Sequence, residues 1–171
     1  LYLLKPKIFK DNRGFFLEIY KNDKYIKKLI NFNFVQDNHS KSTKGVLRGL
    51  HYQLHPKAQE KLIRVIQGEI FDVVVDIRKD SPTYGHWLGE VLSAGNKKQL
   101  WIPPGFAHGF LTLSETAEIL YKTTDFFAPE SERCIAWNDP EIGIEWPLQG
   151  EPILSKKDQN GFPLCNAKES F

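Results

Sequence analysis

The sequence contains little cysteine and no long hydrophobic run. Its only cysteines, Cys134 and Cys165, lack CxxC spacing, so neither a disulfide framework nor a structural zinc site is indicated. Every apolar run is shorter than the ~18 residues that a membrane span requires. We therefore expect a protein of the reducing cytoplasm that does not cross a membrane.

The sequence also lacks a large net charge of either sign. The 23 basic residues nearly balance the 21 acidic ones and leave a net charge of +2. A nucleic-acid-binding domain would show a clustered basic face, so we expect no nucleic acid among the partners. Any anionic ligand must then be bound by a few local side chains.

The residues that are present fit one globular domain, which we expect to span 1–171. The chain is 41% hydrophobic and includes 12 Phe, 6 Tyr and 4 Trp, enough bulky side chains for a substantial core. The sequence begins at Leu1 and not at methionine. We expect a few native residues to precede it, and not a removed signal.

The centre of the chain has the pattern of short strands separated by turn residues. The expected strands are 61–67, 69–78, 87–93, 99–101, 109–113, 118–124 and 133–136. No helical period lies between them, which favours an antiparallel sandwich or barrel over a parallel sheet. We predict an all-β jelly roll.

Two segments depart from this strand pattern. The stretch NDKYIKKLINF, residues 22–32, places its apolar residues on one face, which predicts a short N-terminal helix. From Trp137 onward, proline and glycine recur every few residues. That pattern predicts an irregular C-terminal wrap.

Residues 45–78, GVLRGLHYQLHPKAQEKLIRVIQGEIFDVVVDIR, together with the turn PPGFAHGF at 103–110, resemble the metal-binding frame of small cupins. That frame uses His-x-His, then a Glu ahead of a glycine, and a last His in a Pro-x-Gly-x-x-His turn. His51 and His108 occupy the first and last positions. Gln53 replaces the second His, and Lys61 replaces the Glu. A protonated lysine cannot ligate a divalent metal and repels it, so we predict that no metal binds.

The residues that remain in this frame favour proton transfer next to a carbonyl group. A lone histidine is more often a hydrogen-bonded core residue, and His108 could simply cap its turn. The nearby Arg48 and Lys61 favour a functional role for His51 over a core role. Buried cations without partners are costly, and a site that binds anionic groups would explain them. An ammonium group can also stabilise negative charge on an oxygen, as a metal would.

Several long motifs follow one another in a fixed order: DNRGFFLEIY, QDNHS, GVLRGLHYQ, KLIRVIQGEIFDVVVDIRKDSPTYG, QLWIPPGFAHGFLTLSETAEILYKTTDFFAPE, WNDPEIGIEWP and LSKKD. With them, nearly the whole chain resembles the dTDP-4-dehydrorhamnose 3,5-epimerases. The resemblance implies a cupin-type jelly roll (double-stranded β-helix) and a homodimer. It also implies conversion of dTDP-4-dehydro-6-deoxy-D-glucose to dTDP-4-dehydro-L-rhamnose without a cofactor.

The resemblance further implies catalytic roles. In that family the 4-keto group acidifies the hydrogens on C3 and C5, and each is removed and returned on the opposite face. Carried over, His51 is the general base and Tyr121 the acid across the ring. Lys61 would stabilise the enolate oxygen, and His108 would line the same pocket. Asp158 would be the carboxylate that orients the base.

The residue patterns by themselves leave other interpretations open. A mid-strand tyrosine such as Tyr121 is most often a packing residue. Asp72 and Asp76 share one face of a strand, so either could orient the base or be an exposed strand charge. The resemblance favours Asp158 as the orienting group.

The substrate-binding positions that the resemblance implies are Arg13, Glu18, Gln36, Asn38, Arg48, His108, Phe127, Glu132 and Lys157. Arginine suits phosphate because its planar fork matches phosphate oxygens, whereas Glu132 could equally be a solvated surface charge. Many members have tyrosines where this chain has Phe126 and Phe127. Phe127 can stack on thymine but lacks the hydroxyl. N-terminal strands of the family cross to the partner, so Arg13 and Glu18 would serve the neighbouring site.

Alternatives from other classes stay open. A single-carbon epimerase or a 3,4-ketoisomerase on a related dTDP-4-keto-6-deoxy sugar would use the same residue types, because each reaction enolises a 4-keto sugar. A non-catalytic sugar-nucleotide-binding cupin would keep its ligand affinity without His51. Stoichiometric iron or nickel in the purified protein would favour a cupin oxygenase.

Overall fold

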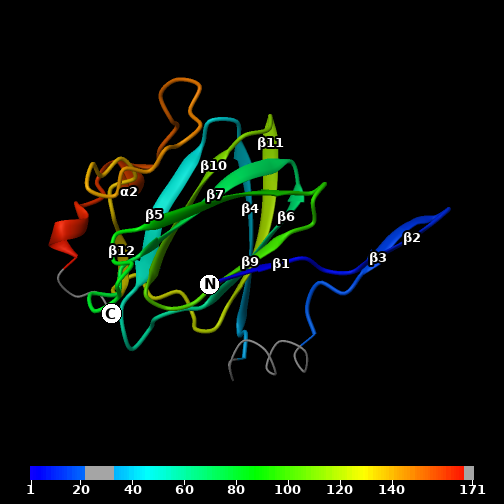
Figure 1. The fold of residues 1–171 in the computed structure, drawn as a ribbon, viewed down its shortest axis with the longest axis horizontal. Helices are drawn as coiled ribbons and strands as arrows, with labels where there is room; N and C mark the ends of the chain where they lie inside the picture. The colour runs from blue at the N-terminus through cyan, green and yellow to red at the C-terminus, as the bar shows by residue number, and fades with distance from the viewer. Residues whose placement is uncertain (22–32, 168–171) are drawn as a thin grey trace.

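The computed structural model describes residues 1–21 and 33–167. These residues form two five-stranded sheets and a separate two-stranded hairpin (Figure 1). This architecture confirms the predicted all-β jelly roll. The helix predicted at 22–32 lies outside the described residues, and a single domain over the whole chain stays a prediction.

Every neighbouring pair of strands in the two sheets is antiparallel. The first sheet has the order β1-β9-β6-β11-β4, and the second β12-β5-β10-β7-β8. The first sheet consists of β1 (Tyr2–Leu4), β4 (Gln36–Thr43), β6 (Lys61–Gln67), β9 (Gln99–Ile102) and β11 (Thr116–Thr123). The second consists of β5 (Leu47–Gln53), β7 (Glu69–Asp76), β8 (Trp87–Ser93), β10 (Phe106–Thr112) and β12 (Glu132–Cys134), and the hairpin of β2 (Ile8–Asp11) and β3 (Gly14–Leu17).

The central strands follow the sequence pattern closely. β6 and β8 begin and end at the predicted residues, and the ends of the other predicted strands shift by one to three residues. The prediction omitted β1 to β5. β4 is the polar edge strand QDNHSKST, and β5 is interrupted by Gly49, so neither shows the apolar alternation by which strands are recognised.

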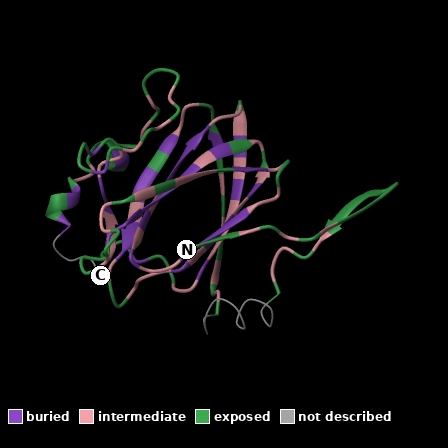
Figure 2. Ribbon diagram, in the orientation of Figure 1, coloured by how far each residue is buried: buried purple, intermediate pink, exposed green. Residues whose placement is uncertain are grey.

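Two apolar clusters account for the layers of the molecule. One includes Ile63 of β6 and Phe110 of β10 and lies between the sheets. The other joins Val73 and Val75 of β7 to residues of the C-terminal segment such as Leu164. Buried residues therefore run along both faces of β7 (Figure 2), which explains the unbroken apolar run in its sequence.

The C-terminal segment has little regular structure, as predicted. Its helical parts within the described residues are α2 (Lys156–Gln159) and a short 3-10 turn, η1 (Leu164–Asn166). Ser155 caps α2 by accepting a hydrogen bond from the Asp158 N–H at 3.2 Å. Within residues 1–21 and 33–167 the helices are too short to cross a membrane.

A bulge in β5 brings two glycines together. His108 pairs with His51 and Phe110 pairs with Arg48, so β5 carries one residue more than β10 between these pairs. Gly49 in the bulge has a φ of 125°, and a Cβ there would lie 2.5 Å from the Cα of Gly109. The bulge therefore requires glycine for both its backbone conformation and its close contact.

We predict that Gly49→Ala destabilises the fold by ~3 kcal/mol or more, because the new Cβ meets backbone and the φ is strained. Urea unfolding would measure the change. Gly95→Ala is the matched control, since its Cβ would meet only the Ser93 hydroxyl at 3.6 Å. Equal stability of the two variants would contradict the prediction.

Candidate active site

A cavity of about 470 Å³ lies between the two sheets. Its walls come from β4, β6 and β11 of the first sheet, and from β5, β10, β12 and α2. The predicted residues that line it are Gln36, Asn38, Arg48, His51, Lys61, His108, Tyr121, Phe127, Glu132, Lys157 and Asp158. The fold thus brings all the predicted site residues except Arg13 and Glu18 to one cavity.

His51 lies against Asp158. Its Nε2 is 2.7 Å from the Asp158 Oδ1, an ion-pair distance, although this nitrogen makes no well-aligned hydrogen bond. Asp158 is 3% exposed and also accepts hydrogen bonds from the Gly49 N–H at 3.1 Å and from the Ser155 hydroxyl. Burial alone would raise the pKa of Asp158, but contacts with His51, Ser155 and Gly49 outweigh it and lower that pKa to about 2. The carboxylate is therefore ionised at neutral pH.

A second histidine–aspartate pair lies beside the first. The Nε2 of His108 is 3.0 and 2.9 Å from the two oxygens of Asp72, which is fully buried. Asp76, on the same strand, is bound instead by Arg78, Ser81 and Thr83. Neither aspartate contacts His51 or is exposed, so both alternatives considered for them are wrong.

Lys61 brings a positive charge to the cavity. Within the described residues, its ammonium group has no hydrogen bond or ion pair. Burial lowers the pKa of Lys61 to about 8, although the nearby Glu132 and Asp72 favour the charged form. An unpaired, desolvated ammonium of this kind is costly unless a ligand supplies negative charge.

Tyr121 and His51 approach the cavity from different sheets. Tyr121 lies on β11 opposite Asn38 and Ile63 of the neighbouring strands, whereas His51 lies on β5. Burial raises the pKa of Tyr121, which keeps its hydroxyl protonated. A ligand between the sheets would therefore have an imidazole on one side and a protonated hydroxyl on the other.

The comparisons with known proteins agree with this geometry. Residues 1–166 match the family described as dTDP-4-dehydrorhamnose 3,5-epimerase. A Pseudomonas aeruginosa protein of that name is 59% identical, over 96% of this chain and 91% of its own length. The chain belongs to the dTDP-4-dehydrorhamnose 3,5-epimerase family. Its fold is accordingly the cupin fold of these epimerases, and its enzyme class is isomerase, as the sequence predicted.

Two solved structures of such epimerases are also similar. The one from Legionella pneumophila, in complex with dTDP-4-keto-L-rhamnose, has a TM-score of 0.93 and 52% identity and covers 96% of this chain and 87% of that one. The one from Bacillus anthracis, with TDP and PPi bound, has a TM-score of 0.91 and 48% identity and covers 94% and 92%. These epimerase structures contain a dTDP-sugar or TDP.

The epimerase cavity is also lined by polar pairs and one exposed ring. Lys157 contacts both carboxylate oxygens of Glu132 at 2.8 Å, so Glu132 is an ion-paired residue rather than a solvated one. The Gln36 amide donates to the Asn38 side chain at 2.9 Å. Phe127 is 53% exposed and lines the cavity. A planar apolar ligand group could cover this ring.

Arg13 and Glu18 do not reach this cavity. Arg13 lies at the turn of the β2–β3 hairpin, which projects away from the sheets (Figure 1). Its side chain is 85% exposed, and its guanidinium pairs with Asp11 at 2.6 Å. In the epimerase chain alone, these two predicted residues are therefore remote from the others.

Sequence reasoning did not single out Cys134. Its Sγ and ligand atoms of His51 and Asp158 lie within 4.8 Å of one another, so these three could hold a metal ion. Burial raises the pKa of the Cys134 thiol to about 12, and a protonated thiol is a poor ligand. Cys134 lies directly opposite His51 in the pairing of β12 with β5. Knowledge of that strand pairing would have been needed to identify it.

Ser155 and Gln53 also line the cavity without having been predicted as site residues. For Ser155 the signal was available, since S-x-x-D in LSKKD is a helix-capping pattern that fixes the Asp158 backbone. For Gln53 the sequence indicated only a lost metal ligand. Its hydrogen bonds depend on the loop that folds beside it.

We predict that Lys61→Met raises the free energy of unfolding by about 1–3 kcal/mol at pH 7, because it removes an unpaired desolvated charge. The folded-state pKa of Lys61 lies below its ordinary value, so the wild type gains stability as pH rises from about 8 to 10.5. The advantage of the variant should therefore shrink over that range.

Urea unfolding at several pH values would measure this difference. Lys44→Met is the control, since Lys44 is exposed and lies 3.9 Å from Glu115. A Lys61→Met variant less stable than the wild type at pH 7 would show that the ammonium group stabilises the fold.

Proposed function

We propose that the chain epimerises dTDP-4-dehydro-6-deoxy-D-glucose at C3 and C5 to dTDP-4-dehydro-L-rhamnose, without a bound cofactor. Membership of the epimerase family and the L. pneumophila complex with dTDP-4-keto-L-rhamnose support this substrate. The observation that supports it most directly is the approach of His51 and Tyr121 to one cavity from different sheets. Inversion at a carbon needs proton removal on one face and proton return on the other.

In this proposal His51 is the general base. Its Nε2 faces Asp158, so Nδ1 is the nitrogen that would accept the proton from carbon. The C–H electron pair moves into the ring and leaves negative charge on the former keto oxygen. Asp158 holds the imidazole in place and stabilises its protonated form.

Lys61 and Tyr121 complete the reaction. The ammonium of Lys61 would stabilise the enolate oxygen in the role that a metal plays elsewhere. The Tyr121 hydroxyl would then donate its proton to carbon on the face opposite His51, and exchange with water would remove the proton from His51 and return one to Tyr121 before the next carbon reacts. His108, held by Asp72, would line the sugar pocket.

The remaining lining residues would bind the nucleotide. Arg48 suits the diphosphate, because a guanidinium matches phosphate oxygens. Phe127 would stack on the thymine, and Gln36, Asn38, Glu132 and Lys157 would surround the nucleotide. The protein would act in the reducing cytoplasm, consistent with its free cysteines Cys134 and Cys165.

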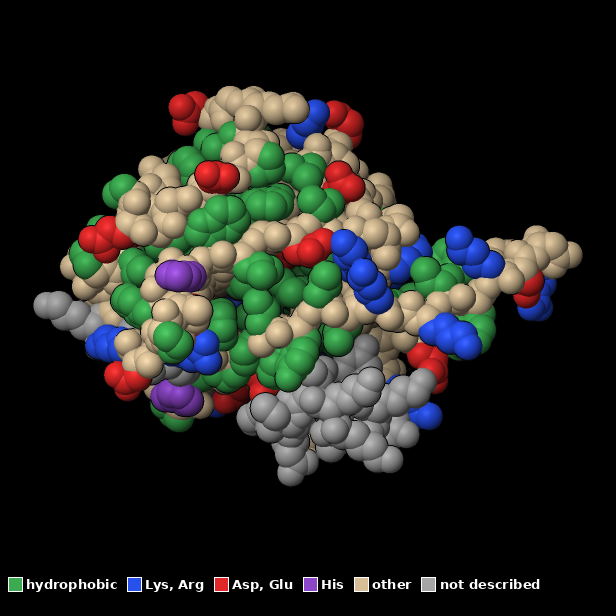
Figure 3. Space-filling view, in the orientation of Figure 1, with side chains coloured by type: hydrophobic (Ala, Val, Ile, Leu, Met, Phe, Trp, Pro, Cys, Tyr) green, Lys and Arg blue, Asp and Glu red, His purple; other side chains and the backbone are tan. Residues whose placement is uncertain are grey.

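Arg13 and Glu18 would act in the pocket of a second copy of the chain. The hairpin that carries Arg13 exposes Phe9, Phe15 and Phe16, and exposed apolar surface of this extent favours an interface. Hydrophobic side chains also gather across the face viewed in Figure 3. We propose a homodimer in which each hairpin completes the partner's site.

Proton exchange with solvent tests the reaction. Substrate incubated in deuterated water with wild-type protein should acquire deuterium at both C3 and C5. His51→Asn should abolish the exchange, because no other group takes the proton, whereas Tyr121→Phe should still allow removal but impair return on the opposite face. Mass spectrometry and proton NMR would locate the label.

The same experiment separates the alternatives. Label at one carbon alone would indicate a single-carbon epimerase, and a shifted carbonyl would indicate a ketoisomerase. Complete and equal loss of exchange in both variants would contradict the proposed division between base and acid. Asp37→Asn serves as a control, because Asp37 is exposed and paired with Lys122 at 2.8 Å.

Mixing inactive variants tests the dimer. We predict that His51→Ala and Arg13→Ala proteins, unfolded and refolded together, regain activity, because the mixed dimer has one pocket with both an intact His51 and the partner's intact hairpin. Random pairing would restore about a quarter of wild-type activity. Refolding each variant separately is the control, and activity no higher than the mean of the separate samples would refute sharing.

A further inference from the structure

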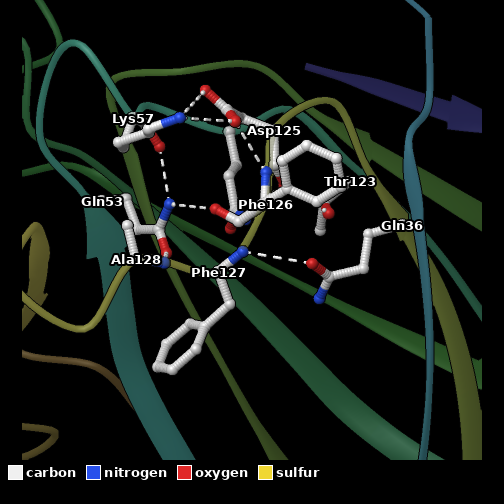
Figure 4. Close-up of polar contacts among 9 residues, drawn as sticks. Gln36, Gln53, Lys57, Thr123, Asp125, Phe126, Phe127 and Ala128 are labelled. Atoms are coloured by element: carbon white, nitrogen blue, oxygen red, sulfur yellow. Dashed lines mark hydrogen bonds and ion pairs between the residues drawn. The ribbon is translucent and has the colours of Figure 1, made fainter.

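The Gln53 side chain is buried beside the cavity, and its amide is fully occupied by backbone groups. Its Nε2 donates to the Lys57 carbonyl at 2.6 Å and to the Phe126 carbonyl at 3.2 Å. Its Oε1 accepts from the Ala128 N–H at 2.9 Å (Figure 4). Gln53 is 5% exposed. This residue stands where a metal-binding cupin would have a histidine ligand, yet here it binds main chain.

Two of these contacts are with residues 124–128, which we name the aromatic loop because it carries Phe126 and Phe127. Side chains also hold other peptide groups of this loop. The Asp125 carbonyl accepts from Gln59 at 2.8 Å and from Thr123 at 2.9 Å. The Phe127 N–H donates to the Gln36 side chain at 3.1 Å (Figure 4).

The two rings of the aromatic loop are held mainly by its backbone. Phe126 is 58% exposed and Phe127 is 53% exposed, so packing leaves more than half of each residue uncovered. The rings point to different sides of the loop in Figure 4, and only Phe127 is among the residues that line the cavity. Which ring faces the cavity therefore depends on how the peptide groups between Asp125 and Ala128 are fixed.

Gln53 suits this task because it offers donors and an acceptor together. Two carbonyl oxygens and one N–H surround its amide. A glutamate would bring no donor and would place negative charge beside two carbonyls, and a leucine would leave all three groups unsatisfied. A histidine has two ring nitrogens for three partners. The amide is the group that satisfies this set.

We propose that Gln53 is a positioning residue for the nucleotide base: it fixes the aromatic loop so that the Phe127 ring lies at the cavity, ready to stack. This inference rests on the proposed function, in which Phe127 contacts thymine. Gln53 touches no reacting group in this scheme, so its loss should weaken binding and leave proton transfer intact.

Titration with thymidine diphosphate tests the proposal without involving the sugar. We expect Gln53→Leu to weaken binding about tenfold, to raise KM by a similar factor and to change kcat by less than about threefold. Gln53→Glu, which keeps the shape and removes the donors, should act in the same direction. Phe126→Ala is the matched control, because Phe126 is as exposed as Phe127 but does not line the cavity.

A double-mutant cycle then asks whether Gln53 acts through the ring. In a Phe127→Ala background, Gln53→Leu should weaken thymidine diphosphate binding by less than about twofold, because the group that it positions is gone. If the double variant instead loses affinity by the product of the two single-variant factors, the two residues act independently and the proposal is overturned. A kcat loss that matches the KM change would also overturn it, since it would place Gln53 in the chemistry.

Failure of the proposed function gives a different result. A wild type that binds thymidine diphosphate but exchanges no deuterium would refute the epimerase reaction, while the binding cycle would still decide the role of Gln53. A wild type that does not bind thymidine diphosphate overturns the positioning proposal. If Gln53→Leu does not fold, as judged by circular dichroism and Tm, Gln53→Glu carries the same test.

Discussion

The contact between His51 and Asp158 is the constraint on which the rest of the site depends. Asp158 belongs to the C-terminal segment, while His51 belongs to β5. Three separate features meet at that carboxylate: the capped turn of α2, the N–H of Gly49 in the bulge, and the apolar packing of the C-terminal segment on the second sheet. An irregular segment can hold a buried carboxylate in a fixed position because the segment is bound at several points.

One cation that lines the cavity has no partner among the described residues, whereas Arg48 is hydrogen-bonded to the Ser42 hydroxyl and the Lys41 carbonyl. Both histidines have an aspartate partner, and Glu132 has Lys157. Lys61 is left unpaired among the described residues that line the cavity, and burial disfavours its charged form. Such a group stores free energy that a ligand recovers when negative charge develops beside it. In the proposed function, the enolate oxygen would supply that negative charge.

The local sequence pattern and the spacing of motifs predicted the central strands and part of the cavity. The apolar strands β6 to β8 follow from alternation and turn residues, and the exchange of a carboxylate for Lys61 follows from spacing within one segment. Contacts between distant segments could not be derived in the same way. The pairing of His51 with Asp158, and not with Asp72, depends on which strands are neighbours and where the C-terminal segment docks. The family resemblance supplied that pair; periodicity did not.

The bulge at Gly49 also changes the phase of β5. Along a regular strand, residues three apart point to opposite faces, and Arg48 and His51 would be on different sides of the sheet. The extra residue shifts the alternation by one, and both side chains line the cavity. One short strand thereby presents a guanidinium and an imidazole to the same cavity. A deletion of one residue here would move one of these side chains to the outer face of the sheet, so the length of the bulge decides whether both reach the cavity.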